Sequence, residues 1–88
     1  PFADASQEKA EEVKQRVLRN ESSPIEYFMY KRLLDPKALA QAMGITVWRL
    51  KRHCKPNVFK KLDQNELQEY AKIFNVQVND IINFREDA

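Results

Sequence analysis

Helix-breaking residues divide this chain into short segments, and the division limits the folds that it can adopt. Pro24 and Pro36 suit the first turn of a helix, where a missing N–H costs no hydrogen bond. Gly44, the only glycine, suits the left-handed end of a helix, and Pro56 ends a helix. Because no segment alternates apolar and polar residues over a useful length, we expect no β-sheet. The sequence therefore predicts an all-α fold of short helices.

Apolar residues at helical spacing locate these helices. Helices are predicted over residues 1–20, 25–34, 36–43, 47–54 and 63–74. Asp35, Thr46 and Asp63 precede three of them and are good helix caps. Residues 57–62 are predicted to be a connection between helices.

The carboxy-terminal residues are predicted to form one last short turn. It starts at Asn79 or Asp80 and holds Ile81, Ile82 and Phe84.

The segment 1–20 is charged and carries only a thin apolar stripe of Ala10, Val13 and Val17. This stripe is too narrow for a core helix, so three roles stay open: a docked surface helix, a dimerisation arm or a linker. We expect an amino-terminal arm over residues 1–22 and a separate domain over 23–88.

The segment 25–34 is apolar on two faces, which indicates a helix packed on both sides. One face holds Ile25, Phe28, Met29 and Leu33, and the other holds Tyr27, Tyr30 and Leu34. The domain core covers one side, and either the amino-terminal helix or a second copy of the protein covers the other.

Length and residue usage exclude several functions. A chain of 88 residues suits one domain, and its apolar runs are too short to span a membrane. Cys54 stands alone beside the only histidine, His53, so we expect no internal disulfide and no metal site. The chain shows no paired nucleophile and base, and no glycine-rich phosphate loop, so we expect neither an enzyme nor a cofactor. We expect no secretory leader and a cytoplasmic, nucleoid-associated protein.

Charge is distributed unevenly along the chain. Residues 1–26 hold four Lys/Arg against six Asp/Glu, residues 27–62 hold nine against one, and residues 63–88 hold two against six. Between Pro36 and Leu62 there are seven Lys/Arg and no acid. A basic block confined to one part of a domain is typical of a phosphate-binding surface, although a solvated face without a partner gives the same pattern.

The segment from Leu39 to Leu50, LAQAMGITVWRL, resembles the helix-turn-helix of the phage Cro and repressor class. Ala40 is small where the second helix crosses, and Gly44 permits the sharp turn. Apolar residues such as Ile45 lock the two helices. The resemblance covers roughly residues 23–84 and implies about five helices of the lambda-repressor-like type, with the charged amino-terminal helix added.

The resemblance also implies which side chains meet DNA. Outward positions of the second helix would face base edges in the major groove: Val47, Trp48, Lys51 and Arg52. Side chains around them would hold phosphates: Lys37, Gln41, Thr46, Arg49, Lys55, Lys60 and Lys61.

The chain departs from the family pattern at several positions. Pro36 stands where the family often has a phosphate-holding glutamine, and Trp48 is large for a reading position. Met29 and Cys54 stand where many members bury an Arg–Glu pair, so we expect these two to touch in the core and Cys54 to be inert. We expect His53 at the surface or at the edge of the groove.

The leading hypothesis is therefore a repressor-like transcriptional regulator that binds specific double-stranded DNA as a homodimer. The alternative is a protein–protein interaction module on a helix-turn-helix scaffold, antitoxin-like or an adaptor, that uses the surface around Trp48. A membrane partner is not expected.

Overall fold

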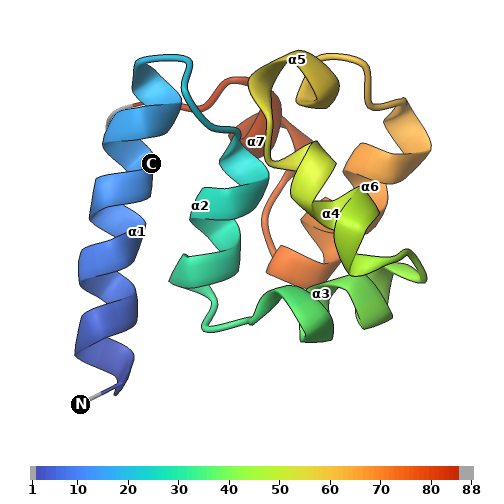
Figure 1. Ribbon diagram of the computed structural model, residues 1–88. Helices are drawn as coiled ribbons and strands as arrows, with labels where there is room; N and C mark the ends of the chain where they lie inside the picture. Colours follow the sequence, from blue (N-terminus) through green and yellow to red (C-terminus); the bar gives the residue numbers. More distant parts are fainter. Residues whose placement is uncertain (1, 86–88) are drawn as a thin grey trace.

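The computed structural model describes the backbone of residues 2–85 and the side chains of residues 5–85. Within that range the chain is all-α and has no strand, as the sequence predicts (Figure 1). The helices are α1 (Phe2–Leu18), α2 (Pro24–Lys31), α3 (Pro36–Met43), α4 (Val47–His53), α5 (Pro56–Phe59), α6 (Gln64–Phe74) and α7 (Val78–Ile82).

The helix ends follow the capping chemistry of the sequence. Asp35 Oδ1 accepts a hydrogen bond from the Ala38 amide at 2.7 Å and so starts α3. Asp63 and Glu66 form a reciprocal capping box at the start of α6, and Asn75 ends α6 with a left-handed φ of 58°. The predicted caps Asp35, Thr46 and Asp63 are thus confirmed.

Two short elements differ from prediction. The segment after Pro56 was expected to be a connection, but it contains α5. Pro56 follows the end of α4 and also takes the first position of this new single-turn helix. The last helix begins at Val78 and not at Asn79 or Asp80, because Asp80 Oδ2 accepts from the Gln77 amide at 2.9 Å. Ile82 in that helix is 51% exposed.

The core is a cluster of apolar and aromatic side chains from every helix except the short α5. Its aromatic centre joins α2 to the carboxy-terminal helices: the Phe28 and Phe74 rings stack at 5.5 Å, and the Tyr27 ring meets Phe84 edge-on at 5.0 Å. The buried apolar residues are Ala10, Val13, Ile25, Tyr27, Phe28, Met29, Leu39, Ala40, Leu50, Leu67, Tyr70, Ala71, Phe74 and Ile81.

Helix α1 lies antiparallel beside α2 and covers its second side (Figure 1). Val13 is fully buried and Ala10 nearly so, which corrects the expectation that this stripe is too narrow for the core. The small side chains let α1 approach α2 closely, so a narrow stripe suffices. Leu33 was wrongly expected on the packed face, because α2 ends at Lys31 and Leu33 adopts a φ of 58° with 48% of its surface exposed.

An ion pair at the edge of this contact joins the two helices. Arg16 Nη2 on α1 lies 2.9 Å from Glu26 Oε2 on α2, and the Ser22 hydroxyl donates to the other oxygen of the same carboxylate. Both charged side chains are largely shielded from solvent. A shielded pair of this kind is stabilised by its charge-assisted hydrogen bonds.

We predict that Val13→Ala destabilises the whole domain, because it removes two buried methyl groups from the α1–α2 contact. The expected loss in the free energy of unfolding is roughly 2 kcal/mol, from transfer plus residual cavity. Urea denaturation measures it, with Gln15→Ala on the exposed side of α1 as the control, expected within about 0.5 kcal/mol of the parent. Equal effects of the two substitutions would mean that α1 is not part of the cooperative core.

Candidate nucleic-acid interface

The turn between α3 and α4 sets the angle of α4. Gly44 takes the left-handed conformation, with φ 71° and ψ 31°, and the Ile45 amide then donates to Ala40 O at 3.0 Å. Thr46 Oγ1 accepts from the Arg49 amide at 3.0 Å and starts α4. The predicted end at Gly44 and start at Thr46 are both confirmed.

The inward side of α4 carries Leu50 and His53. His53 is only 3% exposed, so the expectation of a surface histidine is wrong. Its Nδ1 lies 2.6 Å from the Tyr70 hydroxyl on α6, and its carbonyl accepts from the Ser23 hydroxyl at 2.7 Å. The three-residue spacing from Leu50 to His53 places both on one face of a helix, and this signal in the sequence was available to predict the burial.

Burial governs the ionisation of the groups behind α4. Desolvation lowers the pKa of His53, against the opposing pull of the Glu66 carboxylate. Desolvation also raises the pKa of the Tyr70 hydroxyl well above its usual range, so this hydroxyl keeps its proton.

Cys54 follows α4 and is half-buried against the core. Burial raises the pKa of its thiol to about 12, which fits an inert cysteine. Met29 is buried in the same core cluster. The direct contact of Met29 with Cys54 stays a prediction.

The outward side of α4 is basic and aromatic. Trp48 is 69% exposed, and the Arg52 guanidinium lies over its ring at 5.1 Å from the centroid, a cation–π contact. Lys51 is exposed beside them, whereas Val47 is half-buried and packs partly against the core. Of the four expected base-facing residues, three are thus exposed and Val47 presents only part of its side chain.

The seven residues expected to hold phosphates are all exposed: Lys37, Gln41, Thr46, Arg49, Lys55, Lys60 and Lys61. They lie on or next to α3, α4 and α5, and α2 separates these helices from α1 (Figure 1). Among them, Arg49 forms an ion pair, because its Nη2 lies 3.5 Å from Glu66 Oε2.

A groove of about 520 Å³ runs beside α4, between this helix and the segment that joins α5 to α6. Three cations, Arg49, Arg52 and Lys61, line it together with Trp48 and the apolar Val58 and Leu62. His53 and Glu66 complete its lining. The groove extends the basic surface of α4 toward α5.

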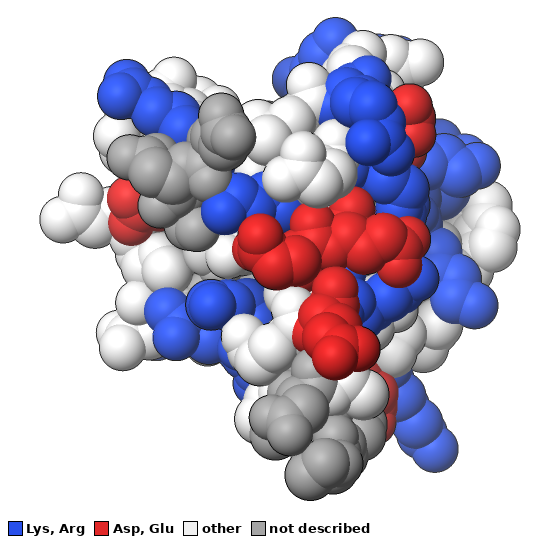
Figure 2. Space-filling model, turned by 90° about the vertical axis from the view of Figure 1, so that its left-hand side faces the viewer, with Lys and Arg blue, Asp and Glu red and all other residues white. Residues whose placement is uncertain are grey.

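The opposite side of the molecule has a different electrostatic character. Figure 2 views the face that α1 covers and shows acidic side chains gathered in its middle. The exposed Glu8, Glu11 and Glu12 belong to α1. Lys9, Lys14 and Arg16 of the same helix pair with Glu11 and Glu12, so this face is mixed in charge, whereas the α4 side is mainly basic.

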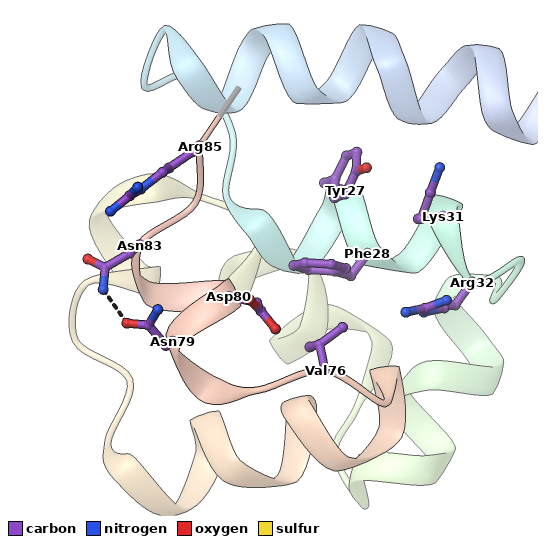
Figure 3. Close-up of a pocket in the computed structure, with 9 residues that line it drawn as sticks. All are labelled: Tyr27, Phe28, Lys31, Arg32, Val76, Asn79, Asp80, Asn83 and Arg85. Carbon is purple, nitrogen blue, oxygen red and sulfur yellow. Dashed lines mark hydrogen bonds between the residues drawn. The ribbon is translucent and has the colours of Figure 1, made fainter. Parts of the chain in front are cut away.

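A second groove of about 520 Å³ lies between α2 and α7 (Figure 3). Lys31, Arg32 and Arg85 line it with Asp80, and its apolar wall includes Phe28 and Val76. Arg32 is already engaged, because its Nε donates to Phe74 O at 2.8 Å. Since no residue of α3, α4 or α5 lines this groove, it is separate from the candidate interface.

The residues that the structure describes lack two features that would indicate other functions. These residues contain no cluster of three or more His, Cys, Asp or Glu that is able to hold a metal ion. None of their helices combines the length and the apolar character that crossing a bilayer requires.

The comparison with protein families agrees with the geometry. Residues 25–87 match the family model of the Cro/C1-type HTH DNA-binding domain, and the chain belongs to this family. No curated protein and no solved structure matches the chain. The predicted resemblance is therefore confirmed, and the whole of α1 lies outside the matched residues.

We predict that Gly44→Ala destabilises the domain through the backbone alone, because a Cβ at this position meets no atom within 4 Å. The left-handed φ of 71° costs an alanine about 1–2 kcal/mol in the free energy of unfolding. Gly44→Asn is the matched control, with a smaller loss, since Asn tolerates this conformation better. Urea denaturation of both variants measures the difference, and an Asn variant as unstable as the Ala variant would contradict the backbone explanation.

Proposed function

We propose that this protein binds duplex DNA sequence-specifically and regulates transcription, with α4 lying in the major groove. The observation that carries the proposal is the outward side of α4, where Trp48, Lys51 and Arg52 are exposed and Thr46 fixes the start of the helix. Membership of a DNA-binding domain family supports the same function. We further propose a repressor-like role in the cytoplasm, at the nucleoid.

Within this proposal, Lys51 and Arg52 donate to guanine edges, as cationic side chains do in the major groove. Trp48 holds the Arg52 guanidinium by its ring and so restricts the directions from which this donor reaches a base. The exposed part of Val47 meets a thymine methyl group.

Phosphate contacts supply the remaining affinity. Lys37, Gln41 and Thr46 flank α4 on the α3 side, and Lys55, Lys60 and Lys61 flank it on the α5 side. Each cation that neutralises a phosphate releases counterions, so binding weakens steeply as salt rises.

The proposal includes two copies on each DNA site. A reading helix of seven residues contacts only a few base pairs, and domains of this kind gain affinity by placing two helices in successive major grooves. Because α1 already covers the second side of α2, and α1 itself exposes acids, the pairing surface lies outside the α1–α2 contact. Sedimentation of the DNA complex gives the number of chains.

The exposure of Trp48 favours one second candidate, a protein-partner surface on the same face. An exposed tryptophan is typical of an interface anchor. In this alternative the basic groove around Trp48 takes an acidic partner, and DNA does not compete for it.

We predict that replacing Lys51 and Arg52 together by Ala lowers DNA affinity at least tenfold, because each lost base contact is worth about 1–3 kcal/mol. The measurement is fluorescence anisotropy with a duplex selected from a random pool, at several salt concentrations. The salt slope is expected to fall only if these cations also reach phosphates. Lys72→Ala in the last turn of α6 is the control for loss of an exposed cation outside α4, and it is expected to leave DNA affinity close to that of the parent.

Urea denaturation of each variant separates loss of binding from loss of folding. A folded double variant with unchanged DNA affinity would contradict the proposed reading role of α4. No duplex binding by the parent protein would favour the protein-partner alternative.

A further inference from the structure

One carboxylate oxygen stands between the basic surface of α4 and the histidine buried beneath it. Glu66 Oε2 lies 3.5 Å from Arg49 Nη2 and 3.7 Å from His53 Nε2. The Arg49 side chain is more than half exposed, whereas that of His53 is almost fully buried. Glu66 is therefore close enough to interact electrostatically with both Arg49 and His53.

Glu66 is held in place by the start of α6. Its other oxygen, Oε1, accepts from the Asp63 amide at 3.3 Å in the capping box. The stretch from Pro36 to Leu62 contains no acid of its own, and the fold brings this carboxylate to α4 from the next helix. Glu66 thus occupies, in the free protein, a place next to Arg49 that a DNA phosphate would take.

The hydrogen-bond pattern fixes which nitrogen of His53 carries the proton. The Glu66 carboxylate can only accept, and it faces Nε2, so the hydrogen of the neutral ring lies on Nε2. Nδ1 is then the acceptor, and the Tyr70 hydroxyl donates to it at 2.6 Å.

The groups around His53 balance its charge. From α6, Glu66 favours the protonated imidazole, and the Tyr70 hydroxyl acts as a neutral donor. From α4, Arg49 and Arg52 oppose protonation, and Lys61 lines the same groove. Burial and these cations together keep His53 neutral while Arg49 and Glu66 are paired.

We propose that Glu66 is a positioning residue that releases Arg49 to a DNA phosphate, and that His53 takes up one proton from solvent as the new partner of Glu66. The proton binds at Nδ1, where the Tyr70 hydroxyl turns from donor to acceptor, and Nε2–H of the charged ring faces Glu66. This inference rests on the proposed function. The phosphate draws Arg49 away, so the carboxylate loses its cation. A partly buried carboxylate without a partner is costly, and an imidazolium beside it removes that cost.

The sign of the pH dependence follows. When Arg49 leaves, His53 loses a neighbouring cation that lowers its pKa, while the Glu66 carboxylate, which raises its pKa, stays in place. The pKa of His53 is therefore higher in the complex than in the free protein. DNA binding is therefore tightest at a pH below both pKa values of His53, that of the free protein and that of the complex. Binding weakens as the pH rises from the lower of these pKa values to the higher. One linked proton changes the dissociation constant up to about tenfold per pH unit.

The test measures duplex affinity across this pH range at constant ionic strength for the parent protein and two variants. Glu66→Gln keeps an oxygen for the Asp63 amide but removes the charge. It is expected to bind more tightly than the parent at high pH, with a flattened pH dependence. Glu69→Gln, an exposed acid of the same helix, is the matched control and is expected to follow the parent profile.

NMR provides a readout that needs no variant, because His53 is the only histidine and its ring signals are unambiguous. The inference predicts a higher titration midpoint for these signals in the DNA complex. An unchanged midpoint, or a pH dependence that survives in Glu66→Gln, overturns it. Duplex binding without pH dependence leaves the proposed function standing and this inference wrong, whereas no duplex binding at any pH removes both.

Discussion

Helix α4 has seven residues, and a helix of that length is not stable by itself in water. Its orientation depends on contacts made by its inward side and its ends. Leu50 is buried in the core, the Thr46 hydroxyl caps the first turn, and the His53 carbonyl accepts from Ser23, the residue that caps α2. These contacts fix the orientation of α4, and Trp48, Lys51 and Arg52 are therefore left exposed on its opposite side.

Charge is separated across the molecule by the same arrangement. The basic helices α3 to α5 lie on one side of α2, and the acids of α1 lie on the other (Figures 1 and 2). The whole of α1 lies outside the matched family region, yet it buries Val13 and pairs Arg16 with Glu26, so it packs firmly on the domain. The added helix is therefore part of the packed fold. Glu66 is the exception on the basic side, and its place beside Arg49 makes it the natural competitor for a phosphate.

The parts of the fold that local chemistry dictates were predictable from the sequence. Asp35, Gly44 and Asp63 form their caps from neighbouring residues alone, so a short window of sequence contains the whole interaction. The burial of His53 was predictable from its three-residue spacing to Leu50, but its partners Glu66 and Tyr70 were not, because they come from a helix later in the chain. The candidate site was predictable as a set of exposed cations around one helix. The role of each side chain stays a prediction, because base and phosphate contacts are properties of a complex and not of the free chain.

The central claim is that the outward side of α4 meets DNA, and the only tryptophan, Trp48, stands on that side. The most direct measurement is a titration of the protein with mixed-sequence duplex DNA at two salt concentrations, followed by tryptophan emission. We expect an emission change that weakens at the higher salt, because phosphate contacts hold the helix at the DNA. An emission that stays constant at both salts, with Trp48 still accessible to a soluble quencher, would contradict it and would point to a protein partner.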